Sequence, residues 1–261
     1  MTATEIIALI AAAAAAGMVN AIAGGGTLIT FPVLLFFKTP EKVANATSTL
    51  ALVLGMAGSL FGYREHLAAV RIWLWRFVPV SILGGLAGSV LLTHTDDKVF
   101  AQMVPFLILF ATLLFLAQGT FRKLSGFDNS KSPTPPHQRH HAIGIAILVQ
   151  IGVAIYGGYF GAGIGILMLA SLGFIGLSNI HEMNSLKTIL ASLINLVASA
   201  WFITSGLIDW PKAMIMTGGA LGGYYLGSHF AQRIPQQQVR RLINGIGLTI
   251  SAIMFYKQFA K

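Results

Sequence analysis

Two glycine-rich stretches have the clearest chemical potential in this sequence. Gly24-Gly25-Gly26 and Gly161-Ala162-Gly163 each interrupt a long, uncharged, mostly apolar run. Such a break exposes the first N–H groups of the next helix, where the helix dipole is positive, and anions bind at these termini. The stretches therefore predict anion-binding positions. Glycine that only allows close crossing of helices is the alternative explanation.

Lys187 is a second candidate, because no other Lys or Arg falls inside a predicted membrane span. A charge within the bilayer costs about 2.5–3.5 kcal/mol on insertion scales, so it usually faces a cavity or a partner. We expect Lys187 to add positive charge to the anion site. Alternatively, its side chain extends to the membrane surface and pairs with Glu182.

Amides and hydroxyls gather around these positions, and acids do not. Hydrogen-bond donors without carboxylates suit an oxyanion, although hydrogen bonding between helices explains about half of these residues equally well. Ser185 and Asn195 belong to the same polar group. The predicted substrate-binding residues are Asn20, Gly24, Gly25, Gly26, Thr27, Asn45, Thr47, Ser48, Thr49, Gly161, Gly163, Asn184, Lys187 and Thr188.

The sequence carries no recognisable enzyme chemistry. It has no cysteine, no Walker A pattern, no nucleophile elbow and no His-Glu-x-x-His. His137, His140 and His141 lie in a Pro-rich segment without carboxylates at ligand spacing, so we interpret them as solvated rather than metal-binding. The sequence therefore predicts a protein that is not an enzyme and has no cofactor and no bound metal.

Composition shows which elements must position these residues. Of 261 residues, 55% are hydrophobic and 10% are charged, and the mean hydropathy is +0.75. Soluble domains have about 25% charged residues, so this composition indicates an all-α polytopic membrane protein. The net charge of +9 is scattered between apolar runs, which fits membrane topology rather than nucleic-acid binding.

Eight runs contain no Asp, Glu, Lys or Arg: 6–37, 43–63, 77–95, 99–121, 142–181, 188–208, 213–232 and 242–256. A spanning helix needs about 20 apolar residues, so 6–37 and 142–181 are too long for one helix. The first is interrupted at Gly24-Gly25-Gly26 and the second at Gly157-Gly158 and Gly161–Gly165, and the pieces that remain, 27–37 and 164–176, are too short to cross. They predict half-helices, which either re-enter or complete a crossing.

The chain divides into two similar halves, 1–121 and 142–261, joined by the polar linker 122–141. NATSTLALVLGMAGSLFGY (45–63) matches NSLKTILASLINLVASAWF (184–202), and GGLAGSVL (84–91) matches GGALGGYYLG (218–227). About five segments per half make the halves inverted repeats. Every arginine falls on the linker side, so the positive-inside rule predicts a cytoplasmic linker and extracytoplasmic termini.

AIAGGGTLITFPVLL (21–35), VANATSTLAL (43–52), GYRE (62–65) and MNSLKTILASLINLVASAWFITSGLIDWP (183–211) give the chain a family resemblance. They resemble the sulfite exporter TauE/SafE family of membrane permeases, over nearly the whole chain outside the linker. The second half departs at Ala162 and Leu169, where a stricter pattern has glycine and proline. The resemblance implies a bacterial inner-membrane permease for sulfite, sulfonates or related organosulfur anions.

The combined expectation is a secondary anion transporter in which the two halves rock around a midplane site at the breaks. An anion channel or passive pore with the same site is the alternative. The expected partners are a small anionic substrate and the lipid bilayer, without nucleic acid. The anion, the direction of transport, the coupling ion and the oligomeric state stay open.

Overall fold

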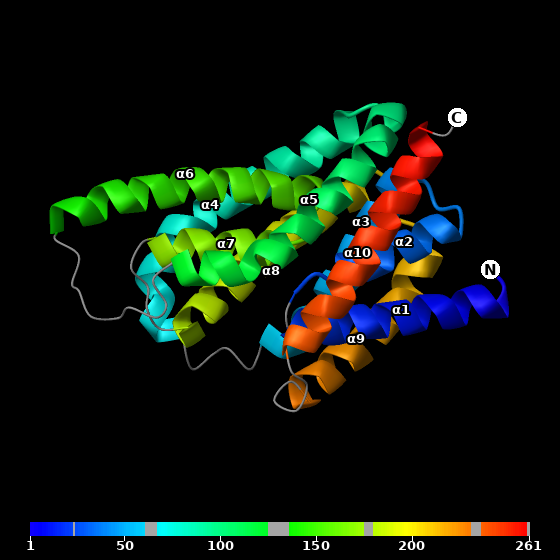
Figure 1. Ribbon diagram of the computed structural model, residues 1–261, viewed down its shortest axis with the longest axis horizontal. Helices are drawn as coiled ribbons and strands as arrows, with labels where there is room; N and C mark the ends of the chain where they lie inside the picture. The colour runs from blue at the N-terminus through cyan, green and yellow to red at the C-terminus, as the bar shows by residue number, and fades with distance from the viewer. Residues whose placement is uncertain (23, 61–66, 125–135, 175–179, 231–235, 260–261) are drawn as a thin grey trace.

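The computed structural model describes residues 1–22, 24–60, 67–124, 136–174, 180–230 and 236–259. Within these residues the chain forms ten helices and no strand, which confirms the predicted all-α architecture (Figure 1). The helices are α1 (Ala3–Ile22), α2 (Thr27–Phe36), α3 (Glu41–Leu60), α4 (Leu67–His94), α5 (Asp97–Leu124), α6 (Pro136–Tyr159), α7 (Ile164–Phe174), α8 (Ile180–Thr204), α9 (Trp210–Phe230) and α10 (Gln236–Phe259).

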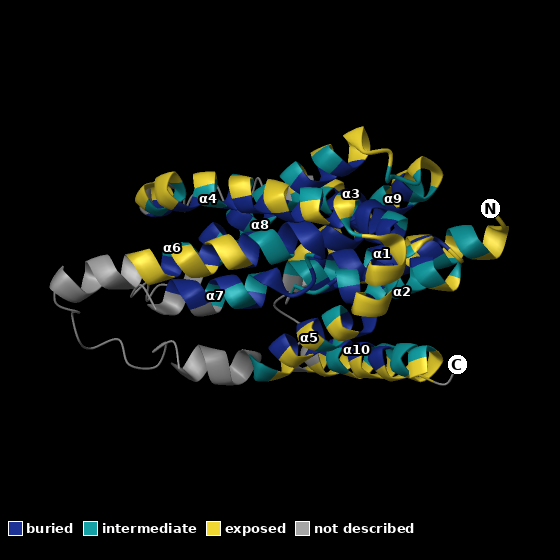
Figure 2. Ribbon diagram, turned by 90° about the horizontal axis from the view of Figure 1, so that it is seen from above, coloured by how far each residue is buried: buried dark blue, intermediate teal, exposed yellow. Residues whose placement is uncertain are grey.

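The surface of the bundle suits a lipid environment. Large apolar side chains are exposed on it, including Trp75, Leu148 and Tyr225, which are each at least 70% exposed. Figure 2 shows exposed residues along the outer sides of the helices and buried residues in the interior. Within the described residues, the segments 3–21, 70–94, 97–117 and 182–204 are long and apolar enough to cross a membrane. The chain is therefore a multi-pass membrane protein, as predicted.

The two predicted half-helices are present. Helix α2 has 10 residues and α7 has 11, and they begin at Thr27 and Ile164, directly after the glycine stretches. At about 1.5 Å per residue, each covers roughly half of a hydrocarbon core about 30 Å thick. The end predicted for the second, Gly176, lies outside the described residues.

The predicted linker is shorter in the structure than its composition suggests. Helix α5 continues to Leu124 and α6 begins at Pro136, so His137, His140 and His141 belong to the first turns of a helix. Proline is favoured at the first position of a helix, where the missing N–H has no acceptor to lose. Residues 125–135 of the linker lie outside the described part of the chain.

Helices from the two halves interleave. The first helix of each half packs on the fourth helix of the other: α1 lies along α9, and α6 lies along α4 (Figure 1). The third helices follow, with α3 on α9 and α8 on α4, while α5 and α10 lie side by side (Figure 2). Neither half is therefore a separate packing unit.

Small residues allow the closest of these contacts. A Cβ on Gly223 of α9 would lie 2.0 Å from the Ala14 carbonyl oxygen of α1. A Cβ on Gly88 of α4 would equally lie 2.0 Å from the Ile155 carbonyl oxygen of α6. Both glycines come from the matched stretches 84–91 and 218–227. Van der Waals contact between backbones is a main source of helix association in lipid, so these stretches are the packing faces of the interleaved helices.

One end of the molecule carries a network of ion pairs and hydrogen bonds, which we call the terminal face. Both termini lie toward this end, and α6 begins at the opposite end (Figure 1). Lys212 pairs with Glu5 at 3.3 Å and with Asp209 at 3.5 Å. Lys42 pairs with Asp97 at 2.8 Å and also donates to the Thr95 carbonyl. These bonds tie together the starts of α1, α3, α5 and α9.

Candidate anion site at the two helix breaks

The two breaks share one backbone geometry. Gly24 and Gly161 have φ angles of 82° and 80°, in the left-handed region where side chains are strained. The Gly24 N–H donates to the Val19 carbonyl at 3.1 Å, and the Gly161 N–H donates to the Tyr156 carbonyl at 3.2 Å. Each bond spans five residues, as in the Schellman motif that ends a helix at glycine. Both predicted breaks are therefore true helix ends, each followed by a new helix start, although Gly157 and Gly158, predicted as part of the second break, lie inside α6.

The breaks contact the same turn of α5. A Cβ on Gly25 would lie 2.3 Å from Cζ of Phe115, so that ring covers the first break. A Cβ on Gly163 would lie 3.6 Å from Leu114 Cδ1 and 3.7 Å from the Ala111 carbonyl oxygen. Two segments separated by more than a hundred residues in the sequence thus meet along one stretch of α5.

At the first break, Asn20 holds the backbone in place. Its Oδ1 accepts the Gly26 N–H at 2.7 Å, and its Nδ2 donates to the Tyr224 hydroxyl at 2.9 Å. A Cβ on Gly26 would lie 2.5 Å from the Ala16 carbonyl oxygen, so α2 also starts against the backbone of α1. In this conformation the Gly26 N–H is occupied and is not presented to an anion.

The hydroxyls predicted in the first half are engaged in protein contacts. Ser48 Oγ lies 2.6 Å from Thr30 Oγ1, and both side chains are buried. Thr49 Oγ1 donates to the Asn45 carbonyl at 2.8 Å, and Thr47 Oγ1 accepts the Asp209 N–H at 3.0 Å. Thr47 therefore ties α3 to the turn before α9. Thr27, at the start of α2, is partly buried.

At the second break, Lys187 lies across the first turn of α7. A Cβ on Gly165 would lie 3.3 Å from Lys187 Cδ, so the lysine stem passes where that side chain would be. The ammonium donates to Asn184 Oδ1 at 3.3 Å. Within the described residues Lys187 makes no ion pair, and its predicted alternative pairing with Glu182 is absent. The carbonyl of Thr188, the next residue, accepts a hydrogen bond from the Ser192 hydroxyl at 2.6 Å.

Two residues that sequence reasoning missed shape the breaks. Tyr156 closes the second break twice: its carbonyl accepts the Gly161 N–H, and its hydroxyl donates to the Ala162 carbonyl at 2.8 Å. Thr30 completes the hydroxyl pair at the first break. The signal for Thr30 was its position one turn after Gly26 on the half-helix. No comparable sequence signal marked Tyr156.

The site is asymmetric in charge. The matched stretches 45–63 and 184–202 align Asn45 with Asn184 and Ser48 with Lys187. One half therefore contributes a hydroxyl pair where the other contributes an ammonium. Among the described residues no side chain caps the N–H groups of 163–165, whereas Asn20 occupies that of Gly26. The start of α7 with Lys187 is thus the part of the site best suited to an anion.

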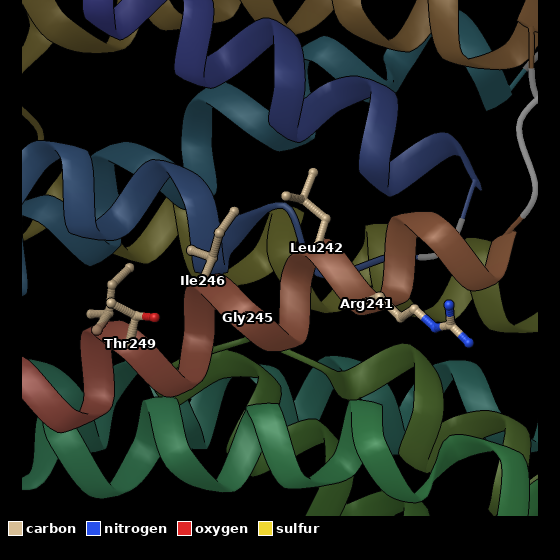
Figure 3. A pocket seen from close by; sticks show the side chains of 6 residues that line it. Arg241, Leu242, Gly245, Ile246 and Thr249 are labelled. Atoms are coloured by element: carbon tan, nitrogen blue, oxygen red, sulfur yellow. The ribbon is translucent and has the colours of Figure 1, made fainter.

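A separate hollow lies beside α10. Figure 3 shows the side chains of this helix that line the hollow, which is open and has a volume of about 490 Å³. Its lining consists of Arg241, Leu242, Gly245, Ile246, Thr249 and Ile250. None of these residues belongs to the breaks, and the lining is mostly apolar, so the hollow is not part of the anion site.

The fold and the site together define a class. A helical bundle with an apolar exposed surface, two glycine-broken half-helices and donor groups at the breaks is a multi-pass membrane transport protein. Comparison with known protein families identifies the family. Residues 9–254 match the family described as sulfite exporter TauE/SafE, and the chain belongs to this family. The resemblance seen in the sequence motifs is thereby confirmed.

Several curated proteins are similar to the chain over nearly its whole length. A probable membrane transporter protein of Haemophilus influenzae is 30% identical over 93% of this chain and 91% of its own. The probable membrane transporter protein YfcA of Escherichia coli is 25% identical over 93% of this chain and 85% of its own. YunE of Bacillus subtilis, also named a probable membrane transporter protein, is 21% identical over 93% and 94% respectively. No solved structure matches the chain.

Proposed function

We propose that the chain is a secondary transporter for small sulfur-containing anions, such as sulfite or sulfonates. The observation that carries this proposal is the position of Lys187 across the uncapped first turn of α7. An ammonium and a helix N-terminus at one place favour negative charge, and no carboxylate among the described residues neutralises the ammonium. The family description and the transporter names of the relatives support the same class.

The interleaved packing supports alternating access but changes the expected moving units. Because α1 packs on α9 and α6 packs on α4, rocking of the two sequence halves would separate the tightest interfaces. We assign the motion instead to two bodies, α1–α3–α9 and α4–α6–α8. The helices α1, α3 and α9 of one body correspond, by their order within the two halves, to α6, α8 and α4 of the other. This correspondence supports inverted repeats. The half-helices and the α5–α10 pair lie at their boundary and would adjust as they move.

For the cell, we propose a bacterial inner membrane location, with the small anion and the lipid bilayer as partners. Both termini lie toward the terminal face and α6 begins at the other end, which supports a topology with the linker opposite the termini. The excess of arginine on the linker side supports a cytoplasmic linker.

Counterflow in proteoliposomes tests the transport proposal. Vesicles containing the purified protein are loaded with unlabelled sulfite, sulfate, thiosulfate, sulfoacetate or taurine and are given a trace of the same labelled anion outside. A transporter accumulates label transiently when the inside is loaded, because the unlabelled anion inside competes with the entered label for the site and slows its exit. Label that equilibrates without overshoot would favour a passive pore. Label that does not enter for any anion in this set would contradict anion transport.

A further inference from the structure

We infer that the last turn of α6 binds a monovalent cation, and that this cation couples to the anion bound at the start of α7. The inference rests on the proposed transport function and names its coupling ion. It starts from two buried oxygens without hydrogen-bond partners in the described part of the chain: Asn45 Oδ1 and Ser199 Oγ. Both residues are only 1% exposed. A buried polar atom left unpaired costs about 1–3 kcal/mol, so such atoms call for a ligand.

Asn45 reaches the last turn of α6 directly. Its Nδ2 donates to the Tyr159 carbonyl at 3.0 Å, which places the unpaired Oδ1 of the same amide beside that turn. The hydrogen bond also fixes the orientation of the amide, because exchanging the two atoms would set two oxygens against each other. The unpaired atom is therefore an acceptor.

Helix α8 brings further oxygens to the same turn. A Cβ on Gly161 would lie 3.5 Å from Asn195 Oδ1 and 3.2 Å from the Gly157 carbonyl oxygen. Asn195 makes no side-chain hydrogen bond within the described residues. Ser199 follows Asn195 by one helical turn, so both side chains lie on the same face of α8.

Bonds at the terminal face bring α3, α6 and α8 together at this level. Lys42, one turn before Asn45, donates to the Thr93 carbonyl at 3.5 Å, and Trp201 of α8 donates to Thr93 Oγ1 at 3.2 Å. The Tyr159 hydroxyl donates to Thr95 Oγ1 at 3.4 Å. The end of α4 thus joins the start of α3, the end of α8 and the end of α6. Ser192, two turns before Ser199 on the same face of α8, has its Oγ 3.9 Å from Met56 Sδ of α3, so this face of α8 is turned toward the helix that carries Asn45.

The electrostatics of this region suit a monovalent cation. The carboxyl end of a helix carries a partial negative charge, and its last carbonyls lack partners within the helix. Tyr156 accepts two N–H groups at this end, whereas no backbone hydrogen bond of the described residues ends on the Gly157 oxygen. The ligands are neutral amides, a hydroxyl and a carbonyl. Calcium sites are normally built with carboxylates, so neutral oxygens alone favour an ion of single charge.

The position of this site explains how coupling would work. Residues 160–163 separate the negative end of α6 from the positive start of α7. A cation at the first and an anion at the second attract each other across the break and lie between the same two moving bodies. Binding of either ion therefore favours binding of the other, and the coupling is reciprocal. A similar division of ions between helix ends occurs in transporters with broken helices.

Thermal unfolding in different salts tests the cation site without any substrate anion. Purified protein is melted in sodium, potassium and N-methylglucamine chloride at one ionic strength. We expect a higher Tm in sodium or potassium than in N-methylglucamine. Ser199→Ala removes one ligand with little change in volume, and we expect it to require about tenfold more of the effective ion, which corresponds to about 1.4 kcal/mol. Asn195→Ala should act in the same direction.

Ser251→Ala is the matched control. Ser251 lies on α10, is 3% exposed and also has an unpartnered Oγ within the described residues, but it is remote in sequence from the α6 turn. Its cation response should equal that of the unaltered protein. Equal melting in all three salts would overturn the inference and would indicate ordered water at these oxygens, since water satisfies them without distinguishing cations.

Counterflow measured with and without the effective cation completes the test. Transport that depends on the cation, with a raised half-saturating concentration in Ser199→Ala, is the expected result. Anion transport that proceeds equally without the cation would overturn the coupling inference and would leave the transporter proposal intact. The two proposals can therefore fail separately.

Discussion

Lys187 lies across the first turn of α7, and Asn20 holds the start of α2 in place, so these two residues set the character of the two breaks. Lys187 stood out in the sequence because a lysine inside an apolar span is costly. That its stem would cross Gly165 was not predictable, because the contact depends on how α7 and α8 pack. The same holds for Asn20, whose amide type suited an anion but whose two hydrogen bonds hold the break to α9.

Lys187→Met should weaken anion binding more than Lys187→Arg. Hydrogen bonds to charged groups are worth about 1.5–3 kcal/mol, so we expect a roughly ten- to hundredfold rise in Kd for Met. Arg keeps the charge but brings a larger planar group beside Gly165, so it should restore binding only in part. Kd is measured by titration of the purified protein, together with Tm.

Lys98→Met is the control for the loss of one positive charge, because Lys98 is exposed at the start of α5. It should leave Kd unchanged. High salt should narrow the difference between the Lys187 variants if water reaches the site. An unaltered Kd in Lys187→Met, with a lowered Tm, would show that the lysine serves stability and would leave the start of α7 as the anion-selective element.

At the level of the helices, the residue at which each half-helix begins could be predicted from the sequence. Thr27 and Ile164 begin the half-helices as expected, because glycine both ends the preceding helix and frees the next start. The start of α6 was not predicted: the Pro-rich composition of 122–141 indicated a linker, yet Pro136 opens a helix. A proline pair is compatible with either outcome until neighbouring helices stabilise one of them.

Gly24 and Gly25 offer a matched test of the first break. Both have φ angles in the left-handed region, 82° and 92°, so alanine at either position costs about 1–2 kcal/mol of backbone strain. Only at Gly25 would the new Cβ meet a neighbour, the Phe115 ring at 2.3 Å, whereas nothing lies within 4 Å at Gly24. Gly25→Ala should therefore reduce both Tm and counterflow more than Gly24→Ala.

A second substitution separates collision from strain. Gly25→Ala combined with Phe115→Leu should recover part of the loss, because the shorter side chain vacates the space the new methyl group needs. Gly25→Leu should abolish transport while leaving folded protein. Normal counterflow in both Gly25→Leu and Gly163→Leu would show that the glycines serve packing alone.

At the scale of the whole molecule, the sequence identified the class but not the packing. Two similar halves could be read from matched stretches, and the glycines at 84–91 and 218–227 were part of that match. The helix that packs on each glycine-rich face could not be predicted, because such a face allows any helix backbone to approach closely. The structure pairs them across the halves, Gly88 with α6 and Gly223 with α1.

Topology is the prediction that belongs to this scale. A reporter fused after Ser130 and one fused after Lys261 should lie on opposite sides of the membrane, with Ser130 cytoplasmic; both positions lie outside the described residues. Cytoplasmic segments of membrane proteins carry an excess of positive charge. The arginines of this chain, among them Arg71, Arg76 and Arg241 on the described helices, fall in segments predicted to lie on the same side as the linker. The lysines Lys42 and Lys212 instead form the ion pairs of the terminal face, where a lysine is already neutralised.

The measurement uses a phosphatase that is active only outside the cytoplasm and a fluorescent protein that is active only inside it, each fused at both positions. We expect fluorescence from the Ser130 fusion and phosphatase activity from the Lys261 fusion. If both positions reported the same side, the five segments of the second half would cross the membrane an even number of times. The matched packing of α1 on α9 and α6 on α4 would then have to arise from repeats of parallel orientation. Inverted halves bring the starts of α2 and α7 towards each other from opposite sides of the membrane, which explains why both breaks contact α5. Parallel repeats would not give this explanation.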